Sequence, residues 1–244
     1  MPAKAMIPLE KQERYRHLYR SQRPGYEDGV AVYAKLVGRY LTPEATVLDA
    51  GCGRGGITEL YWEAVKQAVG VDFDLDSLSE HRCLEQLVRG SLAELPFPSA
   101  SFDVVLCSWV LEHLAQPEVV LEELARVLRT GGHLVLLAPN AWNYVTFAQR
   151  LVPGRFQRRL TRTIYDRNDK DTFALAYKAN TRRALDSALG RLGLVNEEFH
   201  FVGDPSYVAG NDLLFRLAVA WERITDQGPL RNTKVHLVAS YVKA

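Results

Sequence analysis

The sequence is poor in cysteine, and the cysteines that it has do not form a recognisable set. Cys52, Cys83 and Cys107 are the three cysteines among 244 residues. Their number is odd and their spacing matches no metal-ligand pattern, so neither a disulfide framework nor a zinc site is predicted. We expect a reducing compartment, the cytoplasm, and no bound metal.

An excess of charge of one sign is also missing. The 30 Lys and Arg residues nearly balance the 29 Asp and Glu residues, which gives a formal net charge of +1. Such a chain has no overall attraction to nucleic acid or to a membrane, so any electrostatic preference must come from local clusters. The sequence also contains no recognisable nucleic-acid-binding module. A nucleic acid therefore ranks below a small molecule as the expected substrate.

Long apolar runs are absent as well. No stretch approaches the ~20 uncharged apolar residues of a membrane-spanning helix, and residues 1–20 carry charges throughout. We therefore expect neither secretion nor a membrane span. Hydrophobic residues make up 47% and charged residues 24%, as in an ordinary globular protein with a substantial core.

The most informative stretch is a glycine-rich turn after the apolar run Val47-Leu48-Asp49-Ala50. Four glycines follow within six residues, at positions 51, 53, 55 and 56, before a helical pattern begins. This order predicts a buried strand, a tight turn and the start of a helix. Glycines in such a turn let backbone N–H groups approach a cofactor, and the helix start would add a partial positive charge.

Asp49 helps to decide which cofactor this turn would hold. Gly51, Gly53 and Gly56 satisfy the dinucleotide pattern G-x-G-x-x-G, but this pattern alone is a weak signal. In a dinucleotide site the pyrophosphate lies against the turn, where the carboxylate of Asp49 would repel it. A cationic ligand is favoured, and a nicotinamide-dependent dehydrogenase remains the enzymatic alternative.

The segment Asp49-Ala50-Gly51-Cys52-Gly53-Arg54-Gly55 resembles the first motif of class I S-adenosylmethionine-dependent methyltransferases. The run from Leu95 to Val105 is similar to a stretch typical of the small-molecule, methyltransferase type 11-like branch of that superfamily. The resemblance covers residues 47–140. It implies that the glycine turn holds the positively charged methionine part of S-adenosylmethionine.

Asp72 is the expected ribose ligand, because it ends a predicted strand 21 positions after Gly51. The resemblance implies that Phe73 lies near the adenine. It also places Ser91 where relatives usually carry an acid that meets the adenine amino group, so the serine is a departure from the family pattern. The predicted cofactor-binding residues are Asp49, Gly51, Cys52, Gly53, Asp72, Phe73, Ser91, Leu92, Cys107, Ser108, Arg23 and Tyr26.

Two segments could cover the site. Residues 8–41 predict two helices separated by Arg23-Pro24-Gly25, which either form a lid or pack their tyrosines on the sheet. As part of a lid, Arg23 could pair with the cofactor carboxylate. Residues 141–179 are predicted to be an insertion over the acceptor, or a solvated basic face. Between 150 and 170 the cations are Arg150, Arg155, Arg158, Arg159, Arg162, Arg167 and Lys170, against Asp166 and Asp169.

The pattern of elements predicts a doubly wound α/β fold with three layers and seven strands. Five strands are expected at 47–50, 68–72, 86–89, 102–107 and 133–138, and a terminal pair at 194–202 and 234–242. Helices are expected over 58–66, after Asp74 with Asp76 as its cap, and over 117–128, 181–192 and 207–224. We expect one domain over 1–244, with a lid (8–41), a cofactor-binding core (42–140), an insertion (141–179) and C-terminal elements (180–244).

The predicted activity is transfer of a methyl group from S-adenosylmethionine to a small molecule. O-methylation is favoured, with an anionic compound as one acceptor class, and the basic segment could also touch an anionic lipid surface. His113 is the candidate base, because an imidazole with a pKa near ~6.5 suits proton removal at neutral pH. A purely structural His113 is the alternative, with Tyr144, Tyr177 and His200 as rival bases. The non-enzymatic alternative is an inactive S-adenosylmethionine-binding module.

Overall fold

The computed structural model describes residues 8–57, 59–145 and 176–244. The chain divides into two compact units, which are treated separately below. The sheet unit consists of Gly29–Pro139, Leu175–His200 and Leu237–Ala244. The helical unit consists of Met1–Asp28, Asn140–Ala174 and Phe201–His236. The prediction of one domain with a lid and an insertion stays a prediction.

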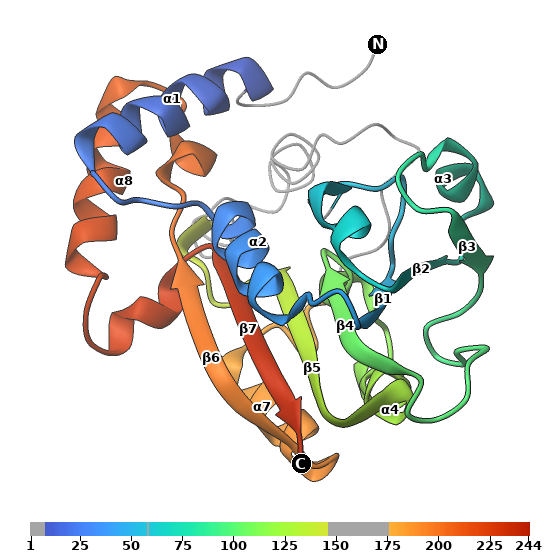
Figure 1. Cartoon of the computed structure of the whole chain (residues 1–244). Helices are drawn as coiled ribbons and strands as arrows, with labels where there is room; N and C mark the ends of the chain where they lie inside the picture. The colour runs from blue at the N-terminus through green and yellow to red at the C-terminus, as the bar shows by residue number, and fades with distance from the viewer. Residues whose placement is uncertain (1–7, 58, 146–175) are drawn as a thin grey trace. The chain divides into compact units, whose positions relative to one another are not determined.

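A seven-stranded sheet forms the first unit, with the order β3-β2-β1-β4-β5-β7-β6 (Figure 1). The strands β1 to β5 pair in parallel, and the arrows of β6 and β7 run in opposite directions in Figure 1. The strands are β1 (Thr46–Ala50), β2 (Gln67–Asp72), β3 (Gln86–Arg89), β4 (Phe102–Ser108), β5 (Leu128–Pro139), β6 (Leu194–Val202) and β7 (His236–Lys243). The predicted doubly wound α/β fold with seven strands is confirmed.

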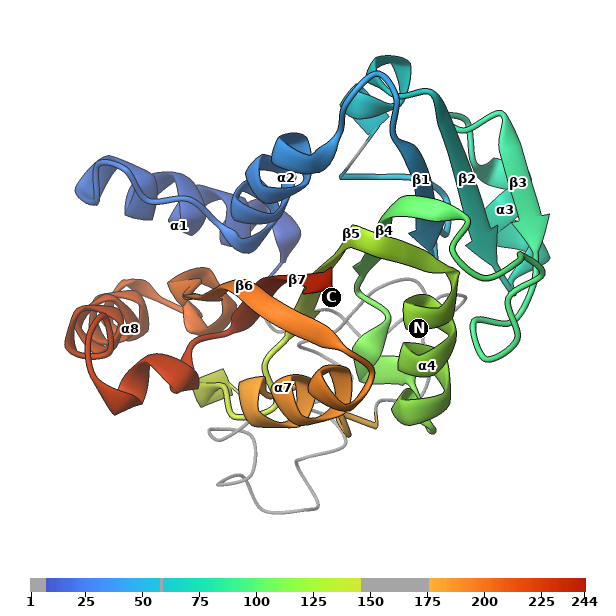
Figure 2. The same cartoon turned by 60° about the horizontal axis from the view of Figure 1, so that its bottom comes forward.

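Helices cover both faces of this sheet. The helix α2 (Gly29–Tyr40) lies on one face, and α4 (Pro117–Val127) and α7 (Arg182–Arg191) lie on the other (Figure 2). Every residue of β1 is buried, as expected for a parallel strand between two helical layers. The carboxyl ends of β1, β2 and β4 therefore meet at one edge of the sheet, where the glycine turn begins.

The predicted starts of α4 and α7 are correct, whereas the cap of α3 (Leu75–Glu80) differs from the prediction. Thr181 caps α7 by accepting the N–H of Ala184 at 3.2 Å, and Pro117 occupies the start of α4. Asp76 was expected to cap α3, but the cap is Asp74, whose carboxylate accepts the N–H of Ser77 at 3.1 Å. Asp74 has the extended backbone that a cap needs, whereas Asp76 already lies in the first turn.

Two other boundaries differ from the prediction. The helix expected over 58–66 is a short 3₁₀ helix, η1 (Glu59–Ala64). Gly55 and Gly56 have φ of 94° and 156°, so no helix can begin within the turn, and the expected charge of a helix start is not provided. The strand β5 begins at Leu128, before its expected start at residue 133. Gly131 and Gly132 lie within this strand, in a stretch where its pairing with β4 is irregular.

The helical unit contains α1 (Leu9–Gln22), η4 (Pro205–Val208), α8 (Asp212–Ile224) and η5 (Pro229–Thr233). The helix expected over 207–224 is divided, because Asn211 caps α8 by accepting the N–H of Leu214 at 2.9 Å. Tyr15 and Phe215 stack with ring centres 4.8 Å apart. The tyrosines of α1 therefore pack against α8 in a small apolar core of this unit.

Buried charges hold the end of α8. Lys234 donates to Glu222 at 2.5 Å and to Asp226 at 2.9 Å. Glu222 is fully buried and Lys234 is 5% exposed. A Cβ on Gly203 would overlap the Glu222 carboxylate, so glycine at 203 makes room for this ion pair.

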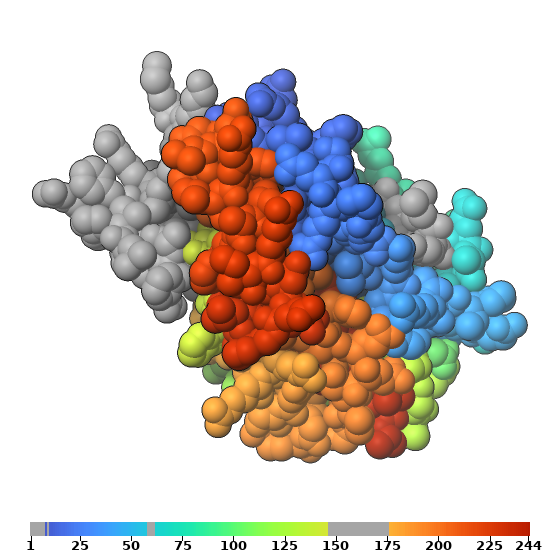
Figure 3. Space-filling view, turned by 90° about the vertical axis from the view of Figure 1, so that its left-hand side faces the viewer, coloured from blue at the N-terminus to red at the C-terminus, as the bar shows by residue number. Residues whose placement is uncertain are grey.

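The outer side of α8 is unusually apolar. Leu213, Leu217 and Ile224 are all exposed by more than half of their surface, and Figure 3 shows α8, in orange and red, facing the viewer. Among the residues that the structure describes, no helix has both the length and the apolar character needed to cross a bilayer.

Candidate functional site

The glycine turn is held against the end of β2 by its own backbone. The N–H groups of Gly51 and Cys52 both donate to the carbonyl of Val71, at 2.8 and 3.1 Å. Gly51 and Gly53 have φ of 80° and 51°, a left-handed conformation that favours glycine. The turn thus bends sharply at the carboxyl edge of the sheet, between Asp49 of β1 and Asp72 of β2.

Asp72 fixes the turn through its side chain. One carboxylate oxygen accepts the N–H of Gly53 at 2.9 Å, and the other accepts the N–H of Asp74 at 2.9 Å. Each carboxylate oxygen can accept more than one hydrogen bond, so both retain capacity for the hydroxyl groups of a ribose. The ribose-binding role of Asp72 stays a prediction.

Asp49 has an unusual protonation equilibrium. Burial, and secondarily the charge of Asp72, raise its pKa to about 7. The residue is only 8% exposed, and a cation placed nearby would favour the ionised form of its carboxyl group. Asp49, beside the glycine turn, therefore favours a cationic ligand over a pyrophosphate.

The segment after β4 packs directly on the turn. A Cβ on Gly51 would overlap the side chain of Val110, so the glycine is required for close packing as well as for its backbone conformation. On the other side, Cys52 Sγ lies 2.7 Å from where a Cβ of Gly70 would be. Burial raises the pKa of the Cys52 and Cys107 thiols well above the ordinary value, so neither is a thiolate nucleophile.

Tyr33 joins this site, although its sequence context indicated only a helix. It lies on α2, is 1% exposed, and hydrogen-bonds with the side chain of Ser108. Burial, and then the nearby charge of Asp49, raise the pKa of Tyr33 far above that of a free phenol. The spacing of Tyr33, Leu36 and Val37 on the buried face could have predicted burial, but no local signal indicates the polar partner.

The predicted adenine-side residues are less enclosed. Phe73 is 57% exposed, and Leu92 is partly buried against the main apolar core. Ser91 is exposed, and its hydroxyl oxygen accepts the N–H of Ala93 at 3.1 Å. Its hydroxyl therefore stabilises its own turn, and contact with an adenine stays a prediction.

A short 3₁₀ helix, η2 (Leu111–His113), follows β4 and carries the candidate base. His113 Nε2 lies 3.8 Å from Oε1 of Glu112, whose residue is 4% exposed. The carbonyl of Glu112 accepts the N–H groups of Ala176 and Tyr177, at 2.7 and 3.3 Å. The structure thus brings His113 and Tyr177 to the same turn, while His200 lies on β6, 2.9 Å from Glu198.

Three other predicted residues belong to the helical unit. Arg23 pairs with Asp226 at 2.8 Å, and Tyr26 donates to the carbonyl of Gly203 at 2.8 Å. Tyr144 donates to the carbonyl of Asp204 at 2.9 Å. Their roles at the cofactor or the acceptor stay predictions, and the basic cluster of 150–170 lies outside the described residues.

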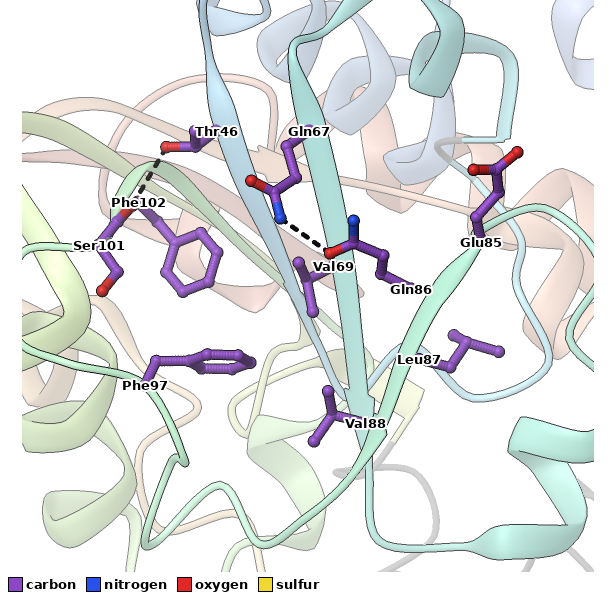
Figure 4. A pocket seen from close by; sticks show the side chains of 10 residues that line it. All are labelled: Thr46, Gln67, Val69, Glu85, Gln86, Leu87, Val88, Phe97, Ser101 and Phe102. Carbon is purple, nitrogen blue, oxygen red and sulfur yellow. Dashed lines mark hydrogen bonds between the residues drawn. The ribbon is translucent and has the colours of Figure 1, made fainter.

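A separate pocket of about 470 Å³ lies at the opposite edge of the sheet. Thr46, Gln67, Gln86 and Phe102 line it, and each stands at the start of a strand. In Figure 4 the rings of Phe97 and Phe102 lie on one side, and the hydrogen-bonded amides of Gln67 and Gln86 lie on the other. This pocket is therefore distinct from the glycine-turn site. Within the described part of the chain, no group of His, Cys, Asp and Glu is arranged to hold a metal ion.

Comparison with known proteins identifies the part of the chain that contains the turn. Residues 48–136 match the family model described as "Methyltransferase domain". These residues are a methyltransferase domain. The match runs from β1 into β5, and so includes Asp49, the glycine turn, Asp72 and η2.

Sequence relatives of this methyltransferase domain agree. A protein of Mycolicibacterium smegmatis, named "Probable S-adenosylmethionine-dependent methyltransferase", is 37% identical over 127 residues, which cover 51% of this chain and 46% of that protein. The demethylmenaquinone methyltransferase of Renibacterium salmoninarum is 32% identical over 146 residues, covering 58% of this chain and 60% of that enzyme. The chain thus spans about half the length of these relatives.

Solved structures support the fold. A methyltransferase in complex with the Haloferax volcanii Trm112 activator aligns with a TM-score of 0.60, covering 96% of this chain and 94% of its own. Its sequence identity of 18% limits this similarity to the fold.

Proposed function

We propose that this protein is an S-adenosylmethionine-dependent methyltransferase that acts on a small molecule. The observation that carries the proposal is the placement of Asp49 and Asp72 on either side of the glycine turn. Asp72 supplies acceptors for ribose hydroxyls, and Asp49 supplies negative charge near the end of the site that would hold a cationic methionine group. Asp49 also disfavours a dinucleotide, because its carboxylate would repel a pyrophosphate that lies against the turn.

The residues of this chain would mainly bind and orient. When bound, S-adenosylmethionine supplies an already activated methyl group, so alignment of the acceptor for in-line attack provides much of the acceleration. The carboxylate of Asp72 would fix the nucleoside end by accepting hydrogen bonds from the ribose hydroxyls. Tyr33, Ser108 and Val110 would form the wall beside the turn, because Tyr33 of α2 hydrogen-bonds with Ser108 of β4 and Val110 packs on Gly51.

For the acceptor we propose a small molecule with an ionisable hydroxyl group, hence O-methylation. His113 would remove the proton, and the buried carboxylate of Glu112 would orient its imidazole from 3.8 Å. The name of the relative that methylates demethylmenaquinone supports a small organic acceptor. The seven cations of 150–170 support an anionic group on it.

Calorimetry separates the main proposal from its alternatives. S-adenosylmethionine should bind with a micromolar or lower Kd, and NADH should not bind. Tight NADH binding without S-adenosylmethionine binding would support a dehydrogenase instead. Incubation with methyl-labelled cofactor and a low-molecular-weight cell extract then tests for enzymatic activity, because an inactive binding module binds the cofactor and labels nothing.

The anionic character of the acceptor has its own test. Once a labelled product is identified, kcat/KM should fall between low and moderate salt, as screening shortens toward ~8 Å. Changing Arg158 and Arg159 to glutamine should have the same effect at low salt. If kcat/KM responds neither to salt nor to these substitutions, the basic segment is a solvated surface without a role in acceptor binding.

A further inference from the structure

The pocket at the amino edge of the sheet is large enough to hold a small molecule. Its volume of about 470 Å³ falls within the ~300–1,000 Å³ of known ligand sites, which are mostly apolar with a few placed polar groups. Every residue that lines it belongs to the sheet unit. The pocket lies at the opposite end of the strands from the glycine turn, so the proposed methyl transfer does not use it.

The connection between β3 and β4 explains why this pocket is open. Parallel strands are usually joined through a helix that covers the sheet, but residues 90–101 contain no helix. They are held beside α4 instead, because Arg126 donates to the carbonyls of Leu95 and Phe97 at 3.0 and 2.8 Å. The missing helix leaves a hollow over β2 and β3.

Two phenylalanines and two valines form the apolar surface of the pocket. The rings of Phe97 and Phe102 meet edge to face, with centres 5.0 Å apart and planes at 88°. Phe102 is buried in the main apolar core, whereas Phe97 is only partly buried against it. In Figure 4 the Phe97 ring extends toward Val69 of β2 and Val88 of β3. A flat ring in this space would therefore contact both aromatic and branched apolar side chains.

The hydroxyl groups of the lining are already engaged within the protein. Thr46 Oγ1 donates to the carboxylate of Asp103 at 2.7 Å. Ser101 Oγ donates to the carbonyl of Pro98, also at 2.7 Å. A ligand would therefore find its polar partner elsewhere in the lining.

The two glutamines supply that partner. Nε2 of Gln67 donates to Oε1 of Gln86 at 2.8 Å, which orients both amides. This bond leaves Oε1 of Gln67 without a partner among the described residues, and in Figure 4 that oxygen points to the side where the rings lie. Among the described lining residues Glu85 carries the only charge, and its carboxylate points away from the rings in Figure 4. The ring side thus presents an uncharged hydrogen-bond acceptor.

We propose that this pocket is a second binding site, which takes an uncharged, flat aromatic heterocycle with an N–H donor, such as an indole. The ring of the ligand packs against Phe97, over Val69 and Val88, and its N–H donates to Oε1 of Gln67. An anionic ligand is disfavoured, because no cation lines the described pocket. The inference is independent of the proposed function, since the two sites lie at opposite edges of the sheet.

The test uses the full chain and two probes that differ by one methyl group, 5-fluoroindole and 5-fluoro-1-methylindole. Fluorine NMR titration should show that wild type binds 5-fluoroindole about five-fold more tightly, because the methyl group removes the hydrogen bond to Gln67. Gln67→Met should abolish this preference and leave the affinity for the methylated probe within two-fold. Phe97→Leu should weaken binding of both probes by about ten-fold, because the flat ring is lost.

Gln116→Met is the matched control, because it removes an exposed glutamine amide outside the pocket. It should leave both affinities unchanged, and so should saturating S-adenosylhomocysteine. If Phe97→Leu does not fold, Gln67→Met alone decides, since Gln67 is exposed.

Three results would overturn the inference. They are a wild type that binds neither probe or binds both equally, a Gln67→Met variant that keeps the preference for 5-fluoroindole, and binding that requires S-adenosylhomocysteine. The last result would place the probe at the proposed acceptor site instead. A wild type that does not bind S-adenosylhomocysteine would contradict only the proposed function.

Discussion

The carboxylate of Asp72 accepts a hydrogen bond from the backbone N–H of Gly53, 2.9 Å away. Asp72, at the end of β2, thus holds the glycine turn that follows the neighbouring strand β1. Because the same carboxylate also accepts from Asp74, it fixes the glycine turn before any ligand arrives. Preorganisation of this kind lowers the cost of binding.

Asp72→Ala should therefore weaken S-adenosylmethionine binding more than ten-fold, through loss of a charged acceptor for the ribose and loss of the anchor for Gly53. Calorimetry measures the affinity, and circular dichroism checks the fold. Asp76→Ala removes an equal charge from an exposed position on α3 and should bind normally. An Asp72→Ala affinity within two-fold of wild type would remove Asp72 from the site.

Asp49 should make stability depend on pH. Its pKa is about 7 in the folded protein, against an ordinary value of 3.8, so the folded state holds this proton more tightly than the unfolded chain. The stability due to the protonated carboxyl is thus present at low pH and is lost as pH rises from about 4 to about 7. Asp49→Asn should lack this contribution.

Urea unfolding of wild type and Asp49→Asn from pH 4 to pH 8 measures the effect, because other titrating groups cancel in the difference between the two proteins. Relative to the variant, wild type should lose stability up to pH 7 and change little above it. Wild type should also bind the cationic cofactor more tightly at pH 8 than at pH 6. A difference that does not vary with pH would contradict the raised pKa.

Gly51 should tolerate no side chain. Gly51→Ala combines an unfavourable left-handed alanine, about 1–2 kcal/mol, with overlap on Val110, about 1–3 kcal/mol. Gly53→Ala has the same backbone strain but no atom within 4 Å of its Cβ, so it should lose only the first contribution. Adding Val110→Ala to Gly51→Ala should recover part of the loss in urea unfolding. Equal losses for Gly51→Ala and Gly53→Ala would exclude the packing explanation.

His113→Ala tests the base. If His113 accepts the proton, kcat should fall ~100-fold or more while cofactor affinity is preserved, and the wild-type kcat/KM should rise with pH through an apparent pKa of about 6 to 7. His200→Ala, on β6, should keep its activity. A His113→Ala variant that retains most of its kcat would show that the imidazole only packs beside Glu112.

Much of this site could be predicted from local sequence, because its key residues follow strands directly. Asp49, Gly51 and Asp72 each stand at a strand end that apolar patterning reveals. Tyr33 could not be found in this way, since it reaches Ser108 from another part of the chain. Tyr177 was named as a rival base, but local sequence could not predict that its backbone reaches Glu112. The prediction of a helix over 58–66 was wrong for a conformational reason. The left-handed Gly55 and Gly56 delay the start of the helix, and only a short 3₁₀ helix forms.

Burial of two of the three cysteines leaves one thiol for covalent labelling of the folded protein. Cys52 is 6% exposed and Cys107 is fully buried, and their raised pKa values suppress the thiolate that maleimides attack. Cys83 is only half-buried. The folded protein should accordingly take up one fluorophore, at Cys83, and report on its own ligands without the removal of any native cysteine.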